Sequence, residues 1–177
     1  MKKALILTGK DVQDHEFIYP YYRLQEEDFN VTVATEEGKE TFGILGTKIP
    51  VNSKIENINP DEYDLLVLPG GAKAMEYMRQ NEKLINLIKN WDKKNKVISS
   101  ICHASQLLIS AGIVKGRKLS GYYSIKDDIN NAGATYVDAP FVTDRNIITS
   151  PHYKYLGPWM KETFKVYYQN DSINKKF

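Results

Sequence analysis

The single cysteine of this 177-residue chain, Cys102, lies where a strand is expected to meet a helix. The β-branched run from Val97 to Ile101 is typical of a buried strand, and residues 104–111 have the apolar spacing of a helix. Free N–H groups and the helix dipole favour a thiolate at such a turn, and the thiolate is the nucleophilic form of cysteine. With His103 beside it, we expect a reactive thiol with a pKa below the ~8.5 of free cysteine, rather than a structural one.

Two further segments end at the same expected edge of the sheet. An apolar strand over residues 63–68 stops at the turn containing Gly70 and Gly71, and the loop after the first strand leads to Glu16. Ligands of open parallel sheets bind at the carboxyl ends of the strands, where these segments and the cysteine can meet. One explanation of Gly70 and Gly71 is that they end the strand, because glycine adopts backbone angles that other residues avoid. A second is an oxyanion hole, in which the backbone N–H groups of Gly70, Gly71 and Ala72 face a substrate oxygen.

Segments with strand and helix patterns alternate along the chain, which predicts a parallel sheet with helices on both faces. The expected strands are residues 4–7, 30–34, 63–68, 97–101, 135–137, 141–142 and 147–149, with short strands in an excursion over residues 41–51. The expected helices are residues 16–27, 82–93, 104–111, 125–131 and 156–168. We expect one domain over residues 1–168 and a fraying polar tail over residues 169–177.

The composition excludes several classes of function. The 24 basic and 22 acidic residues give a net charge of +2 without a basic stripe, so nucleic acid and anionic membranes are not expected partners. One cysteine cannot form an internal disulfide, and no apolar run approaches transmembrane length, so we expect a cytoplasmic protein. Three scattered histidines and one cysteine show no metal-ligand spacing, and we expect neither a metal nor a cofactor.

Several segments, in their order and spacing, resemble the ThiJ/PfpI superfamily, and within it the PfpI-like intracellular peptidases. They are residues 16–24, 63–71, 74–79, 100–103, 108–112, 116–118 and 125–133, so the resemblance covers nearly all of residues 1–168. It implies a flavodoxin-like α/β fold, a three-layer sandwich with a mostly parallel central sheet and a nucleophile elbow at Cys102. It also implies a homodimer or a homohexamer.

The same resemblance implies roles for three side chains around Cys102. Glu16 would lie beside the sulfur and keep its proton, because two adjacent anions repel and burial raises a carboxyl pKa. His103 would be the base, completed by the acid Glu76 from an adjoining subunit, which would fix the imidazole tautomer. Without the resemblance, Glu16 is equally well explained as a first-turn acid favoured by the helix dipole, and Glu76 as a solvated helix residue.

The chain departs from the family pattern close to this site. Ala104 stands where glycine is usual, Met75 replaces a proline before Glu76, and Tyr123 replaces another proline. A stretch that commonly carries an arginine is replaced by one containing His152, which offers polar contacts to a substrate. These departures leave the identity of the substrate open.

Three hypotheses of function remain open. The first is a cysteine-dependent enzyme acting on amide or small carbonyl substrates, as an intracellular peptidase, a glyoxalase III or a deglycase, with a small carbonyl compound or a peptide as its partner. The second is a redox sensor in which Cys102 is oxidised to a sulfinate. The third is a holdase-like stress protein without turnover, which would tolerate loss of Cys102.

Overall fold

The computed structural model describes residues 1–174, and its centre is a seven-stranded sheet of order β10-β11-β7-β6-β1-β2-β5. All neighbouring strands are parallel except β10, which is antiparallel to β11. The strands are β1 (Lys3–Leu7), β2 (Asn30–Thr35), β5 (Ser53–Lys54), β6 (Leu65–Leu68), β7 (Val97–Ile101), β10 (Val142–Asp144) and β11 (Ile147–Ser150). The mostly parallel sheet predicted from the sequence is confirmed.

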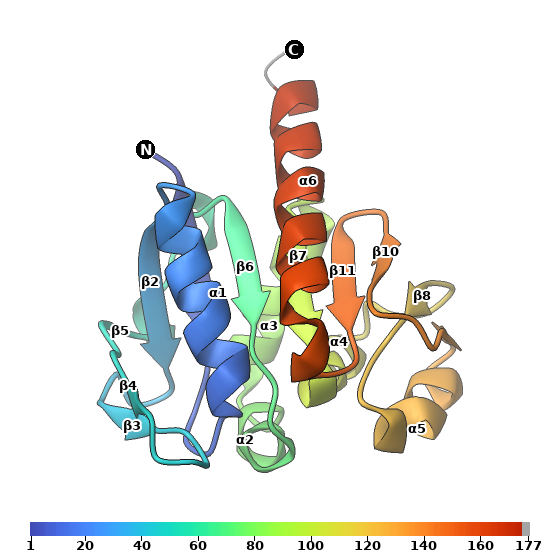
Figure 1. Ribbon diagram of the computed structural model, residues 1–177, viewed down its shortest axis with the longest axis horizontal. Helices are drawn as coiled ribbons and strands as arrows, with labels where there is room; N and C mark the ends of the chain where they lie inside the picture. The colour runs from blue at the N-terminus through green and yellow to red at the C-terminus, as the bar shows by residue number, and fades with distance from the viewer. Residues whose placement is uncertain (175–177) are drawn as a thin grey trace.

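Helices cover both faces of this sheet (Figure 1). The α-helices are α1 (Asp14–Glu26), α2 (Ala72–Met78), α3 (Glu82–Lys93), α4 (Ser105–Ser110), α5 (Lys126–Asn131) and α6 (Leu156–Asn174). In Figure 1, α1 and α6 lie in front of the sheet and α3 and α4 behind it. The strands β1 and β6 are buried on both sides, with Ala4–Leu7 and Leu65–Leu68 fully inaccessible, which explains their unbroken apolar sequences. No helix within residues 1–174 combines the length and the apolar character needed to cross a bilayer.

Short elements fill the connections between the main strands. Two small two-stranded sheets pair β3 (Thr41–Phe42) with β4 (Lys48–Ile49), and β8 (Lys118–Leu119) with β9 (Thr135–Tyr136). Single 3₁₀ turns are η1 (Ile55–Asn57), η2 (Pro60–Glu62), η3 (Cys102–Ala104), η4 (Tyr123–Ile125) and η5 (Tyr153–Tyr155). The hairpin of β3 and β4 lies at the carboxyl edge of the sheet, together with α2 (Figure 1).

The last helix is longer than the sequence analysis expected. The expectation places its end at residue 168, whereas α6 runs to Asn174, so residues 169–174 of the expected polar tail are helical. The remaining tail residues, 175–177, lie outside the described part. Neither glycine nor proline interrupts residues 169–174, and polar residues without such a stop signal continue a helix that tertiary packing has already started.

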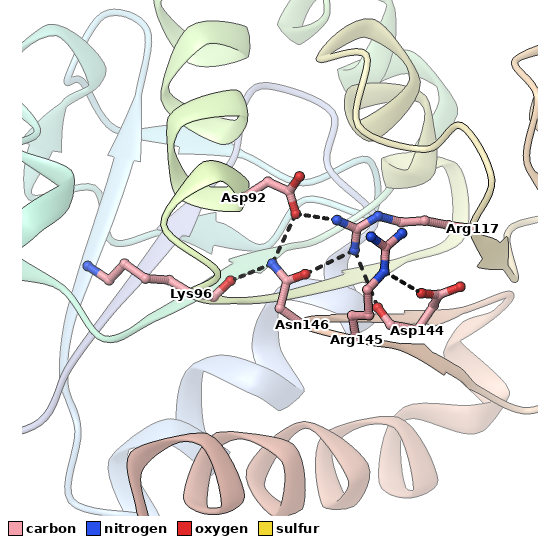
Figure 2. Close-up of polar contacts among 6 residues, drawn as sticks. All are labelled: Asp92, Lys96, Arg117, Asp144, Arg145 and Asn146. Carbon is pink, nitrogen blue, oxygen red and sulfur yellow. Dashed lines mark hydrogen bonds and ion pairs between the residues drawn. The ribbon is translucent and has the colours of Figure 1, made fainter. Parts of the chain in front are cut away.

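A buried ion pair joins three connections at the amino end of the sheet (Figure 2). Arg117 is only 6% exposed, and its Nη2 donates to Asp92 Oδ1 of α3 at 2.7 Å. Its Nη1 donates to Asn146 Oδ1 at 2.9 Å. The amide of Asn146 in turn donates to Asp92 Oδ1 at 3.0 Å and to the carbonyl of Lys96 at 2.9 Å. The side chains of Arg117, Asp92 and Asn146 therefore hydrogen-bond to one another.

We expect Arg117→Leu to lower the free energy of unfolding by about 3–5 kcal/mol, because it leaves the Asp92 carboxylate buried without its cation. For a chain of this length the melting temperature should fall by roughly 10 °C. Thermal and urea unfolding measure both quantities. The matched control is Lys48→Ala, whose ion pair with Glu40 is exposed and should contribute less than about 1 kcal/mol. Equal costs for the two variants would contradict the importance of the buried cluster.

Candidate functional site

Cys102 forms a sharp elbow at the carboxyl end of β7. Its backbone has a φ of 61°, which lies in the left-handed region that residues other than glycine rarely adopt. The strand ends at Ile101, and the turn η3 leads directly into α4. Such strained positions occur where the surrounding structure fixes them, often at functional sites. The elbow predicted from the sequence is therefore present, and the Cys102 side chain itself is 6% exposed.

Three elements place polar groups around the sulfur. The Nδ1 atom of His103 lies 3.2 Å from Sγ. The backbone N–H groups of Gly71 and His103 are directed to the thiol and favour its ionised form, while the Glu16 carboxyl contacts it from α1. The three loops predicted to meet at this edge of the sheet thus do meet, after β1, β6 and β7.

Glu16 is completely buried in the first turn of α1. Its Oε2 accepts a hydrogen bond from the Gly70 N–H at 2.9 Å, and its Oε1 has no hydrogen-bonding nitrogen or oxygen partner among the described residues. Burial raises the pKa of Glu16 to about 7, against the lowering effect of the contacts with Cys102 and Gly70. A carboxyl with this pKa exchanges its proton near neutral pH, which is the property of an efficient acid–base group.

The direction of the Cys102 pKa contradicts the sequence-based expectation. Burial raises the pKa of the thiol, and the negative charge of Glu16 raises it further, outweighing the backbone N–H groups of His103 and Gly71. The strand–helix turn indicated the helix N-terminus, and the family resemblance placed Glu16 beside the sulfur, but neither indicated how deeply the sulfur is buried. Glu16 is consequently the group that titrates near neutral pH, and in its ionised form it can take the thiol proton.

The two glycines are required by close packing of the loops. A Cβ atom at Gly70 would lie 2.5 Å from Glu16 Oε2 and 2.7 Å from Cys102 Cβ, too close for any side chain. Gly71 has a φ of 111°, and a Cβ atom there would lie 2.7 Å from the backbone nitrogen of Gln13. Because the Gly70 N–H is bonded to Glu16, the Gly71 N–H is the one directed to the sulfur.

His103 is held on its other side by Ser124, a residue that the sequence analysis did not single out. The Nε2 atom lies 3.3 Å from Ser124 Oγ. Burial lowers the pKa of His103, so the imidazole is neutral near pH 7 and can accept a proton from the sulfur at Nδ1. Ser124 lies 21 residues beyond the histidine, and only the tertiary fold reveals that it can orient the ring.

The remaining candidate residues lie further from the reacting atoms. Glu76 is exposed on α2 and pairs with Lys73 at 3.2 Å, and no hydrogen bond or ion pair joins it to His103 within residues 1–174. Ala72 is the exposed first residue of α2, whereas Ala104 is fully buried in η3. His152 precedes η5, where its Nδ1 accepts from the Lys154 N–H at 3.1 Å.

A separate hollow of about 510 Å³ lies beyond the ends of β1 and β2, between Thr8, Thr35 and Met78. None of the candidate residues around Cys102 lines it. The side chains that the sequence predicts to do chemistry therefore lie at the elbow and do not line this hollow.

Comparison with known proteins agrees with the fold. The sequence pattern of the DJ-1/PfpI family matches residues 2–166. The chain belongs to the DJ-1/PfpI family. It is 43% identical over 164 residues to a protein of Pyrococcus horikoshii named deglycase PH1704, and the alignment covers 93% of this chain and 98% of that protein. The protein named deglycase PfpI from Pyrococcus furiosus is 42% identical, with the same coverage.

Solved structures of the family have the same architecture. The crystal structure of Drosophila melanogaster DJ-1beta superposes with a TM-score of 0.86 at 26% sequence identity, over 93% of this chain and 90% of that one. The resemblance to the ThiJ/PfpI superfamily and the fold that it implied are thus confirmed.

Proposed function

We propose that this chain is a cysteine-dependent enzyme that acts on small dicarbonyl compounds and on the adducts they form, through Cys102. The observation that carries the proposal is the arrangement at the sulfur: two proton acceptors, Glu16 and His103, and a backbone N–H of Gly71 surround one nucleophile. The deglycase names of the relatives from Pyrococcus support a carbonyl substrate.

The first step is addition of sulfur to an aldehyde carbon. The Cys102 thiol transfers its proton to ionised Glu16 as the S–C bond forms, and the carbonyl π electrons move to oxygen. The Gly71 N–H stabilises the negative charge that develops at the site. Since Glu16 has a pKa of about 7, it is ready to accept this proton at neutral pH. Protonated Glu16 then gives the proton to the alkoxide oxygen, and the product is a neutral hemithioacetal.

The second stage converts the hemithioacetal of methylglyoxal to lactate. Neutral His103 removes the proton from C1, the electron pair moves through an enediol, and protonation at C2 leaves a thioester on Cys102. Water then attacks the thioester carbonyl, releases lactate and returns a proton to the sulfur. Carbon C1 is oxidised and C2 reduced within the same molecule, so the sum is methylglyoxal plus water giving lactic acid, without an external oxidant.

Glu76 enters the proposal through assembly of several chains. Its carboxylate is exposed and does not reach the histidine of its own chain. We propose that a homodimer or homohexamer brings Glu76 of a second copy toward His103, where it would stabilise the imidazolium. Sedimentation of the wild-type protein and of Glu76→Gln, with activity measured on the same samples, tests this assembly.

We expect the purified protein to release lactate from methylglyoxal after complete chelation, and His103→Ala to be slower by a factor of ~10²–10⁴, the usual contribution of a general base. Dicarbonyl loss and lactate release are followed together. The control is Lys89→Ala, an exposed change on α3, which should keep the wild-type rate. Loss of activity with the chelator would contradict the proposal. Formation of a Cys102 sulfinate by mild peroxide without any turnover would instead favour the sensor hypothesis.

A further inference from the structure

Aromatic side chains form a continuous row beside Cys102 that the proposed proton transfers do not use. We call this set the aromatic row; its members in spatial order are His103, Tyr122, His152, Tyr153 and His15, with Tyr123 packed against Tyr122. Successive ring centroids lie 4.7, 5.8, 4.0 and 5.1 Å apart. Three of these four contacts are stacked, with interplanar angles of 24–28°.

Both ends of the aromatic row lie at groups that contact the sulfur. His103 touches Sγ directly, and His15 immediately precedes Glu16 on α1. In between, the Tyr122 N–H donates to the carbonyl of Cys102 at 3.1 Å. The rings come from α1 and from the segments around η3, η4 and η5. Segments that are distant in the sequence therefore form one row, which begins at the thiol with His103.

The row presents aromatic surface to solvent. Tyr123 is 72% exposed and Tyr153 is 40% exposed. Burial lowers the pKa of His103, and burial together with Lys154 lowers that of His152, so both imidazoles are neutral near pH 7. The row itself contains no carboxylate, and Lys154 is the charged group that acts on it, which disfavours a cationic substituent.

We propose that the aromatic row is a binding subsite for a planar, uncharged substituent, such as a phenyl ring, attached to the carbonyl that Cys102 attacks. The inference rests on the proposed function in requiring Cys102 to be the reacting group. Aromatic rings bind one another best in offset stacks or edge-to-face pairs with centroids 4.5–7 Å apart. Tyr153, which packs between His152 and His15, is 40% exposed and is the ring that we choose for substitution.

Alkylation of the thiol tests the subsite without requiring turnover. The second-order rate constants of Cys102 with N-benzyliodoacetamide and with iodoacetamide are measured, and their ratio is divided by the same ratio for glutathione. We expect a normalised preference of about three- to tenfold for the benzyl reagent, the effect of one aromatic contact. Tyr153→Leu should remove the preference and Tyr153→Phe should retain it. Tyr22→Ala, an exposed tyrosine outside the row, is the matched control.

Three outcomes would overturn the subsite: no preference in the wild type, the same preference in Tyr153→Leu, or an equal preference for the cyclohexylmethyl analogue, which would indicate only apolar contact. In parallel, kcat/KM is compared for phenylglyoxal and methylglyoxal, where Tyr153→Leu should weaken phenylglyoxal alone. A benzyl preference without turnover of either compound would retain the subsite and reject the proposed enzyme. Turnover of the dicarbonyls without a benzyl preference would retain the proposed enzyme and reject the subsite.

Discussion

Cys102→Ser is expected to reduce the turnover of small dicarbonyls by about 10³-fold or more while leaving the protein folded. A serine hydroxyl is a much weaker nucleophile than a thiol at neutral pH, and the groups around it offer no strong base. Glu16, with its pKa of about 7, can take a proton from sulfur far more readily than from an alcohol. Lactate release over several hours by the wild type and by the variant measures the loss.

The serine variant is informative because it removes little else. The oxygen is nearly isosteric with sulfur, and the elbow conformation of Cys102 depends on the backbone rather than on the side-chain atom. Thermal unfolding should therefore remain cooperative, at a cost of about 1 kcal/mol, which is typical of a point substitution. Unchanged lactate release from a correctly folded Cys102→Ser protein would mean that the chemistry lies elsewhere, and the hollow near Thr8 would be the next place to search.

The fold could be predicted from the sequence because the local patterns and the tertiary structure agree. The expected helix over residues 82–93 has the same bounds as α3, where Asn81 caps the first turn by accepting from the Leu84 N–H. In contrast, α2 was not among the predicted helical ranges, although Glu76 was considered as a helix residue, since seven residues after the glycine turn are too few to show a helical period. The short strands β5 and β8 were also not predicted, because a two-residue strand is defined by the strand it pairs with and not by its own sequence.

The elbow at Cys102 could be predicted for the same reason, but its electrostatics could not. The sequence shows a thiol at a strand–helix turn, which favours the thiolate. The family resemblance placed Glu16, 86 residues earlier in the chain, at the sulfur. The structure adds the burial of the thiol, and burial and the Glu16 charge together raise the pKa of Cys102. Ser124 and the contacts of Tyr122 with His103 likewise depend on tertiary placement. The tyrosines at positions 122 and 153 can be found in the sequence, but their ring contacts with His103 and His152 cannot.

Glu16→Gln is expected to lower kcat/KM by about 10²–10⁴-fold and to change its dependence on pH. In the wild type, Glu16 can accept the thiol proton only when it is itself ionised. The rate should therefore rise as the pH increases through about 7. The glutamine amide keeps the shape of the side chain and an acceptor for the Gly70 N–H but does not titrate, and the rise should disappear. His103 does not replace this inflection, because burial places its pKa below the ordinary value. Glu26→Gln, an exposed change on the same helix, should keep the wild-type profile.

The same substitution should alter stability in a direction that follows from the raised pKa of Glu16. The native state holds this proton up to a pH of about 7, whereas the unfolded chain releases it near 4.5, the ordinary pKa of a glutamate side chain. The stabilisation associated with the proton is therefore complete below pH 4.5 and is lost as the pH rises to about 7, by roughly 3 kcal/mol. The free energy of unfolding of the wild type, relative to Glu16→Gln, should fall over this window when measured by urea denaturation. A constant difference would show that Glu16 has an ordinary pKa in the folded protein, and it could then not be the base that accepts the proton of Cys102 near neutral pH.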